Sequence, residues 1–246
     1  MEIMEIERDP MLKMIENRLK NIKKIIIFAS GKGGVGKSTI SAHSSYIFSK
    51  KYKTGILDLD LHGPSIPFIL GINNIKIIES ENGIFPVEWN NIKVMSLDIF
   101  MQGRAAPLRG SSKNEIIKEM VGITDFGNLD YLIIDMPPGT GDEYLSTIEI
   151  FREKGEIIFI TAPSKISWQV TKRAIDIAKN QISIKGIIIN MGHNEEIQEE
   201  CKKIRVKCLG SIEYFSYVVD KGIGDLEGTE YFKNLENILK TSGIIH

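Results

Sequence analysis

Residues 31–39 of the chain read Gly-Lys-Gly-Gly-Val-Gly-Lys-Ser-Thr. The apolar run 24–30 precedes this stretch, and residues 40–50, whose composition favours a helix, follow it. A strand, a glycine loop and a helix in this order form the context that the phosphate-binding pattern G-x-x-x-x-G-K-[ST] requires. The glycines let backbone N–H groups converge on one anion, and the following helix directs its positive end to the same point. The sequence therefore predicts a nucleotide-binding loop rather than a glycine-rich turn that binds nothing.

Two side chains of this loop and three carboxylates elsewhere form the predicted site. Lys37 is expected to reach the β- and γ-phosphates, and the Ser38 hydroxyl is expected to bind Mg²⁺. Asp58 and Asp60 lie two residues apart on a predicted strand, so both side chains should point to the same side. Asp135 follows four apolar residues and has the form of a Walker B acid. At the carboxyl ends of parallel strands these acids would face the ligand crevice, although each alone could instead cap a strand end.

The bulk properties narrow the class of protein. With 246 residues, of which 42% are hydrophobic and 26% charged, the chain can form one large α/β domain. The formal net charge of -1 gives no basic excess, so no nucleic-acid partner is expected. No apolar stretch approaches the roughly 20 residues of a transmembrane helix, and acidic residues within 1–5 argue against a signal peptide. Two cysteines are too few for a disulfide framework, and we expect a cytoplasmic protein.

Strand-like and helix-like segments alternate along the chain. This order predicts a single P-loop α/β domain, residues 24–246, with a mostly parallel, doubly wound sheet and helices on both faces. A hairpin with a type I′ turn at Asn82-Gly83 is expected between residues 75–78 and 84–89, and Asp142 is expected to cap a helix. The other expected strands are 55–60, 92–97, 131–135, 157–161, 184–190 and 206–212, and the expected helices include 113–121, 142–153, 167–180, 195–203 and 230–240.

Residues 1–23 form a separate N-terminal segment in the predicted organisation. Met11, Met14, Ile15, Leu19 and Ile22 recur at helical spacing with charged residues between them, which predicts an amphipathic helix. Such a helix could bind a partner or a membrane, or it could lie on the surface of its own domain. Charges of both signs without a basic face favour the second interpretation.

Three motifs carry a resemblance to a known family. The second lysine of the loop, Lys32, makes residues 31–39 resemble the deviant Walker A motif of MinD, ParA and the nitrogenase iron protein. Residues 58–67, Asp-Leu-Asp-Leu-His-Gly-Pro-Ser-Ile-Pro, resemble the D-x-D-x-x-G-P-S-x-P segment of the Mrp/NBP35 group. Residues 129–142 are similar to that group's L-D-Y-L-I-I-D-x-P-P-G-T-G-D, and the similarity continues through 161–163 and 189–191. The resemblance covers residues 24–225 and implies an ATP-binding carrier that delivers iron–sulfur clusters to apo-proteins.

The resemblance also implies roles for individual residues. Lys32 would reach across a homodimer to the partner's nucleotide, and Asp60 would position the hydrolytic water with support from Asp58. Asp135 would contact Mg²⁺ through water, together with Ser38 and Asp60 as the metal set. Asn190 corresponds to the residue that reads adenine, whereas Arg109 lies where relatives have W-R-G-P and its role stays open. The implied nucleotide-binding residues are Gly33, Gly34, Val35, Gly36, Lys37, Ser38, Thr39, Asp58, Gly139 and Asn190, and the implied catalytic residues are Lys32, Lys37 and Asp60.

The cysteines depart from the family pattern. Cluster carriers of the group have a C-x-x-C pair after the N-M-S stretch, and each protomer supplies half the ligands of a bridging [4Fe–4S] cluster. This sequence has Asn190-Met191-Gly192 and no C-x-x-C, and its two cysteines, Cys201 and Cys208, are separated by six residues. Two thiolates from each protomer would still give four ligands, but a cysteine within an apolar strand is usually structural. The four histidines, His43, His62, His193 and His246, show no metal-ligand spacing.

Two classes of function remain at this point. The first is a Mg²⁺-dependent, slowly hydrolysing, dimeric ATPase that carries or helps to insert iron–sulfur clusters, with apo-protein clients or cluster-assembly proteins as partners. The second is a nucleotide-gated positioning or scaffold ATPase of the MinD/ParA kind, acting on a membrane, DNA or a protein. Residues 231–246 carry only Lys233 and Lys240 against Glu236, which gives little support for a membrane-binding helix. The motifs at 58–67 and 129–142 favour the first class.

Overall fold

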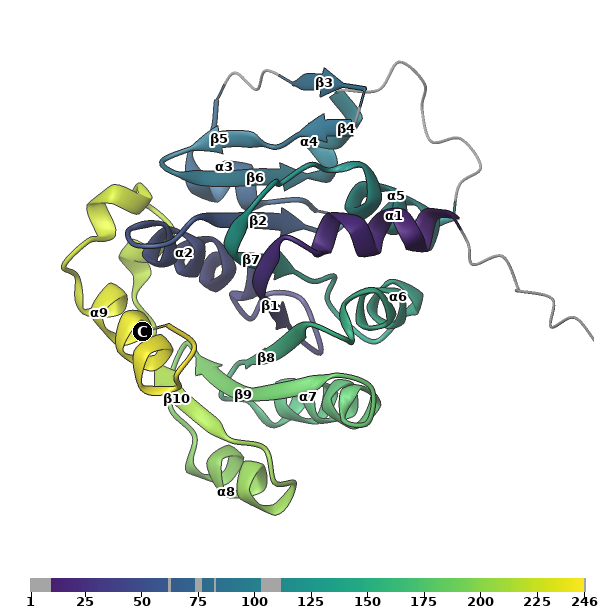
Figure 1. Ribbon diagram of the computed structural model, residues 1–246. Coiled ribbons are helices and arrows are strands. Elements are labelled where there is room, and N and C mark those ends of the chain that lie inside the picture. The colour runs from purple at the N-terminus through teal and green to yellow at the C-terminus, as the bar shows by residue number, and fades with distance from the viewer. Residues whose placement is uncertain (1–9, 62, 74–76, 82, 103–111, 246) are drawn as a thin grey trace, which may run out of the picture.

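A computed structural model gives the fold (Figure 1). It describes residues 10–61, 63–73, 77–81, 83–102 and 112–245. The strands are β1 (Ile22–Ala29), β2 (Thr54–Asp58), β3 (Ile78–Ser80), β4 (Gly83–Phe85), β5 (Val87–Trp89), β6 (Ile92–Ser96), β7 (Leu129–Asp135), β8 (Gly155–Thr161), β9 (Ser183–Asn190) and β10 (Cys208–Ile212). The helices are α1 (Pro10–Leu19), α2 (Lys37–Ser49), α3 (Ile66–Leu70), α4 (Leu97–Gln102), α5 (Lys113–Ile123), α6 (Asp142–Phe151), α7 (Lys165–Ala178), α8 (Glu195–Lys203) and α9 (Glu230–Thr241), with short 3₁₀ turns at Ser216–Val218 and Ile223–Leu226.

The main sheet places β1 at its centre, which explains why the strand before the glycine loop is so apolar. The strand order is β10-β9-β8-β1-β7-β2-β6-β5, and every neighbouring pair except β5–β6 is parallel. Parallel strands covered on both faces lack a solvent-facing side, so the side chains of residues 25–29 are all buried. The predicted fold class, a mostly parallel doubly wound sheet in one P-loop domain, is confirmed.

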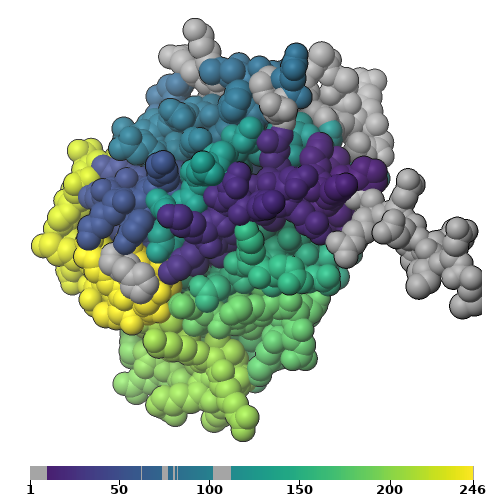
Figure 2. Space-filling model, viewed as in Figure 1, coloured from purple at the N-terminus to yellow at the C-terminus, as the bar shows by residue number. Residues whose placement is uncertain are grey.

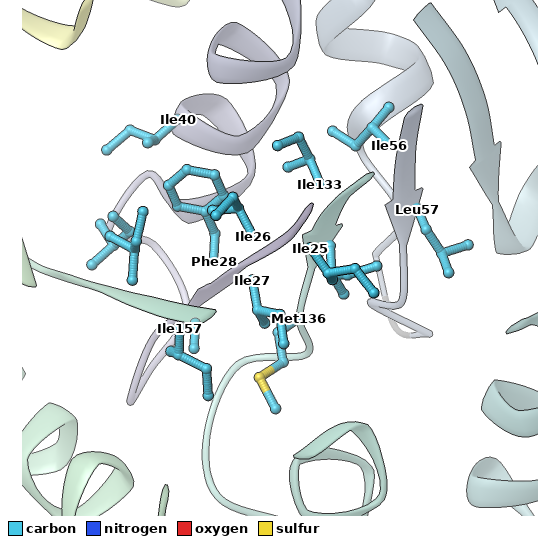
Figure 3. Close-up of a cluster of buried hydrophobic side chains, with 14 of the residues drawn as sticks. Ile25, Ile26, Ile27, Phe28, Ile40, Ile56, Leu57, Ile133, Met136 and Ile157 are labelled. Atoms are coloured by element: carbon cyan, nitrogen blue, oxygen red, sulfur yellow. The ribbon is translucent and has the colours of Figure 1, made fainter. Parts of the chain in front are cut away.

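The core lies on both sides of the sheet. Ile26 and Phe28 point toward Ile40 of α2, whereas Ile25 and Ile27 point to the opposite face (Figure 3). Helices α2 and α9 cover the first face, and α5, α6 and α7 cover the second (Figure 1). Successive residues of a strand point to opposite faces of the sheet. The apolar residues of β1 therefore pack into the core on both faces, and this packing holds the carboxyl end of β1 in place.

The N-terminal helix α1 lies on the surface of the domain and packs against α5 (Figure 2). Ile15 and Leu19 are buried beneath α1. The Arg18 guanidinium donates from Nε to the Gly122 carbonyl at 3.0 Å and pairs with Asp125 at 3.2 Å. These contacts attach α1 to α5, as the amphipathic pattern predicted. The proposed domain boundary at residue 24 stays a prediction.

Local predictions differ from the structure at several points. Strand β2 ends at Asp58, so Asp60 follows the strand instead of belonging to it, and the two aspartates do not share a strand face. Pro86 divides the expected strand 84–89, because proline has no N–H for a ladder. As a result β4 pairs with β3, and β5 pairs with β6. Asp142 is the first residue of α6, and Gly141 is its N-cap.

Further differences concern Cys208 and helix α4. Cys208 begins β10, so it does not lie inside the strand as expected. The composition of residues 101–112, rich in Gly, Arg and Ser, predicts a loop, but helix α4 extends through residues 101 and 102. Several positions named in the sequence analysis lie outside the described residues. They are residues 1–9, His62, residues 75 and 76, Asn82, Arg109 within 103–111, and His246.

Candidate nucleotide-binding site

The glycine loop connects β1 to α2 at the carboxyl edge of the sheet. Gly34 and Gly36 have φ angles of 78° and 80°, a left-handed conformation that favours glycine. A Cβ atom on Gly36 would lie 2.3 Å from Nδ2 of Asn190, and one on Gly31 would lie 2.4 Å from the backbone N of Thr171. Helix α2 begins at Lys37 with Gly36 as its N-cap and without a side-chain cap. The first N–H groups of α2 are therefore directed at the loop, the arrangement that binds phosphate.

Asp135 at the end of β7 is the centre of a buried polar cluster beneath the loop. Its Oδ2 accepts from Lys37 Nζ at 2.7 Å and from Ser38 Oγ at 2.6 Å, and its Oδ1 accepts from Ser41 Oγ at 2.6 Å. The Asp135 side chain is fully buried, and that of Lys37 is 6% exposed. The sequence analysis predicted Lys37, Ser38 and Asp135 as site residues, and the fold brings these three together. It missed Ser41, whose only sequence signal is its position four residues after Lys37 on the same helix face.

Asp58 lies beside this cluster on the neighbouring strand. It pairs in register with Asp135 across β2 and β7 and is completely buried. Its Oδ1 accepts from the backbone N of Asp60 at 3.0 Å, and its Oδ2 accepts from those of Ser65 and Ile66 at 2.9 and 3.1 Å. Burial, followed by the negative charge of Asp135, raises the pKa of Asp58 to about 7. The Asp58 carboxylate therefore holds the backbone N–H groups of Asp60, Ser65 and Ile66, and its expected catalytic role stays a prediction.

The two remaining predicted catalytic residues lie at the rim of the site. Lys32 is exposed, and its backbone carbonyl accepts from Ser30 Oγ at 3.0 Å. Asp60 is half-buried, two residues beyond Asp58, with its backbone held by that carboxylate. Neither side chain belongs to the buried cluster around Asp135. The expected roles of Lys32 across a dimer and of Asp60 at the hydrolytic water stay predictions.

Asn190 and Gly139 connect neighbouring strand ends to the loop. Asn190 closes β9, is 7% exposed, and donates from Nδ2 to the Val35 carbonyl at 2.9 Å. Gly139, with a φ of 92°, donates from its backbone N to the Ser30 carbonyl at 2.9 Å. Asn190 thus touches the loop itself, a contact that the sequence analysis did not anticipate beside its expected role at adenine. Both residues hold the loop to the ends of β7 and β9.

The donor set of the cluster fits a magnesium ion. Mg²⁺ prefers hard oxygen ligands, usually one or two carboxylates with water and substrate phosphates. The Ser38 hydroxyl and the Asp135 carboxylate provide such oxygens beside the N-terminus of α2. Lys37 supplies a compensating cation to the same carboxylate, so the buried negative charge is paired.

The cysteine pair does not fit a cluster shared between two protomers. Cys201 on α8 is completely buried, and Cys208 is half-buried. Cys208 starts β10 while the nucleotide site lies at the carboxyl edge, so four strand residues, roughly 13 Å, separate it from that edge. Within the described ranges, no group of three or more His, Cys, Asp or Glu residues is placed to hold a metal ion. A ligand to a bridging cluster would have to reach the surface, which Cys201 does not.

Comparisons with known proteins agree with this geometry. A family model described as ParA, NUBPL iron-transfer P-loop NTPase, matches residues 21–214. The chain belongs to this family. The iron-sulfur cluster carrier protein of Rickettsia conorii is 44% identical over 194 residues, 76% of this chain and 60% of that protein. The cytosolic Fe-S cluster assembly factor Nubp2 homolog 2 of Drosophila yakuba is 38% identical over 182 residues, 70% of each chain.

Solved structures of similar proteins show the same fold. The nucleotide-binding protein of Archaeoglobus fulgidus in complex with ADP has a TM-score of 0.72 at 28% identity, over 90% of this chain and 95% of that chain. The septum site-determining protein MinD of Pyrococcus horikoshii, complexed with Mg-ADP, has a TM-score of 0.67 at 20% identity, over 89% and 95%. The second likeness concerns the fold alone.

Two further facts bear on the scope of these likenesses. The chain spans 60%, 55% and 55% of the length of the first three curated carrier relatives, all from Rickettsia species. In the part of the chain that the structure describes, no helix is both long enough and apolar enough to cross a bilayer.

Proposed function

We propose that this family member is a Mg²⁺-dependent ATPase that works as a homodimer in the assembly or delivery of iron–sulfur clusters. The observation that carries the proposal is the buried cluster of Lys37, Ser38 and Asp135 beneath a loop whose open helix N-terminus suits phosphate. The match to the iron-transfer family and the names of the cluster-carrier relatives support the part of the proposal that concerns iron–sulfur clusters. We place this protein in the cytoplasm, because the name of the Drosophila relative describes that protein as cytosolic.

The proposed chemistry divides among the residues according to their positions. The backbone of residues 33–39 and the Lys37 ammonium bind the phosphates, while Ser38 and Asp135 hold Mg²⁺, which neutralises charge on the transferred group. Asp60 orients the attacking water at the rim, with its backbone fixed by Asp58. The exposed Lys32 of one protomer reaches the nucleotide of the partner, where it offsets the developing negative charge as an arginine finger does. Asn190 positions the loop through Val35 and offers its remaining amide groups to adenine.

The cluster is cargo in this proposal, and the thiolates that hold it are not those of Cys201 and Cys208. The burial of Cys201 and the distance of Cys208 from the carboxyl edge support this assignment. Ligands would then come from a client or an assembly partner, and ATP binding would change the dimer that meets this partner. Anaerobic reconstitution tests this point through the iron content of each dimer. We expect the Cys201→Ser, Cys208→Ser double variant to match the wild type, and loss of bound iron in that variant alone would contradict the assignment.

The function is tested by the maturation of an apo-protein client. With Mg-ATP, the wild-type protein should accelerate transfer of a cluster from a loaded scaffold protein to an apo-ferredoxin. Lys32→Ala should abolish the ATP effect together with ATP-dependent dimerisation in light scattering. Lys51→Ala is the matched control, because Lys51 is an exposed lysine beyond the far end of α2. If maturation is indifferent to the protein while the ATP-dependent dimer forms normally, the nucleotide-gated positioning ATPase becomes the better account.

A further inference from the structure

The end of α8 brings the two cysteines together. Arg205 has a φ of 57°, Val206 N donates to the Cys201 carbonyl at 3.0 Å, and Arg205 N donates to the Lys202 carbonyl at 3.1 Å. These two bonds around a left-handed residue form a Schellman motif, which ends the helix and reverses the chain. Strand β10 begins two residues later with Cys208. The Cys201 side chain, in the last turn of α8, is the largest influence on the pKa of Cys208, and Cys208 is the largest influence on the pKa of Cys201, so the two thiols lie beside each other.

The two thiols differ in their access to solvent. Cys201 is completely buried, whereas Cys208 is half-buried and lines a cavity of about 500 Å³. Three exposed cationic residues, Lys202, Arg205 and Lys207, line the same cavity. A small polar or anionic reagent can therefore reach Cys208 but not Cys201. One accessible sulfur in contact with one inaccessible sulfur is the arrangement of an attacking and a resolving thiol.

We propose that Cys208 and Cys201 form a redox-active dithiol that a hydroperoxide converts to an intrachain disulfide. In the first step the Cys208 thiolate attacks a peroxide oxygen and the O–O bond breaks. Cys208 becomes a sulfenic acid, and the released hydroxide or alkoxide takes a proton to leave as water or an alcohol. In the second step the Cys201 sulfur attacks the Cys208 sulfur and loses its proton, and the hydroxyl group leaves with that proton as water. Two thiols are oxidised and one peroxide is reduced.

The environment of Cys208 favours the first step. The hydrogen bond from the Cys201 thiol lowers the pKa of Cys208 to about 7, against the opposing effect of burial, and a backbone hydrogen bond at Gly210 acts in the same direction. The same contact raises the pKa of Cys201 and keeps its proton on the buried sulfur. Cys208 therefore has the thiolate character that oxidation requires.

The test uses the full chain, reduced and freed of reductant, and hydrogen peroxide as the probe. Intact mass should show the loss of two hydrogen atoms, free thiols should fall from two to none, and dithiothreitol should reverse both changes. In Cys201→Ser, dimedone should trap a sulfenic acid on Cys208. In Cys208→Ser, oxidation of the buried Cys201 should be at least about tenfold slower than oxidation of the wild type, and unfolding in guanidinium should remove the difference.

Two results would overturn the proposal. One is oxidation of Cys201 in folded Cys208→Ser at the wild-type rate, because Cys208 would then not be the thiol that reacts first with the peroxide. The other is wild-type protein that accumulates sulfenic acid or an intermolecular disulfide without the internal one, since it would mean that Cys201 does not resolve. The serine variants replace sulfur with a smaller oxygen, and their unfolding midpoints in urea confirm that each rate belongs to folded protein.

Discussion

Lys37 and Asp135 form an ion pair inside the protein, with Nζ 2.7 Å from Oδ2 and side-chain exposures of 6% and 0%. The pair joins the first residue of α2, the helix that follows the phosphate loop, to the last residue of β7, the strand beside β1. Ser38 and Ser41 supply hydroxyl donors to the same carboxylate. A charge buried in this way is tolerated only while its partners remain. The pair is therefore part of both the stability of the fold and the proposed chemistry.

Removal of the lysine alone should destabilise the fold through the charge it leaves behind. We expect Lys37→Ala to lower the free energy of unfolding by about 3 kcal/mol, because it leaves the buried Asp135 carboxyl group without its cationic partner. Combining it with Asp135→Asn should recover most of the loss, since the buried group is then neutral. Urea denaturation of the wild type, both single variants and the double variant gives the coupling energy. Additive losses in the double variant would show that the two groups do not interact as described.

Asp60 should affect hydrolysis far more than binding. It lies at the rim, outside the buried cluster, so Asp60→Ala should bind ATP with nearly wild-type affinity but hydrolyse it about a hundredfold more slowly. Phosphate release and calorimetric titration measure the two quantities separately. Glu88→Ala serves as the control, because Glu88 is an exposed carboxylate on the edge strand β5. Wild-type turnover in Asp60→Ala would mean that another residue positions the attacking water.

The pH dependence of stability should carry the signature of His43. This residue of α2 is 2% exposed and its Nδ1 lies 2.9 Å from the hydroxyl of Tyr231, and burial lowers its pKa from 6.5 to about 4. The unfolded chain then binds the proton more readily than the folded protein does. The contribution of neutral His43 to the free energy of unfolding is fully present above pH 6.5. It is lost as the pH falls toward 4, and the loss reaches up to about 3 kcal/mol.

Urea midpoints between pH 7 and pH 4 measure this slope. His43→Asn should flatten it, whatever the variant's stability at pH 7. Tyr231→Phe should keep the slope, because burial lowers the pKa of His43 and the imidazole stays buried in that variant. An unchanged slope in His43→Asn would mean that other groups produce the acid sensitivity.

The sequence predicted the fold well where one local pattern decides the structure. The apolar run before the glycine loop, residues 24–30, indicated a central strand because both of its faces are buried. Helix α8 has the bounds that its pattern predicted, since Asn194 caps it and Arg205 adopts the left-handed conformation just after its end. The end of β2 was wrong by two residues, because the chain leaves the sheet where the Asp58 carboxylate binds later backbone N–H groups, a contact outside the local pattern.

The site was predictable in its motif residues and not in its supporting contacts. Lys37, Ser38 and Asp135 follow from a motif whose chemistry fixes the residue types. Ser41 is a serine within a helix, and only its position four residues after Lys37 distinguishes it from a serine that faces solvent. The contact between Cys201 and Cys208 depends on the turn after α8, which only the folded chain reveals. The roles of Lys32, Asp60 and Asn190 stay predictions.

The most direct test of the central claim is the affinity for Mg-ATP of Lys37→Ala, measured by isothermal titration calorimetry. Asp135→Asn with Lys37→Ala serves as the stable companion variant, so that loss of binding is separated from loss of folding. We predict saturable binding of one nucleotide per protomer in the wild type and no detectable binding in both variants. Full wild-type affinity in folded Lys37→Ala would contradict the assignment of residues 31–39 as the phosphate site.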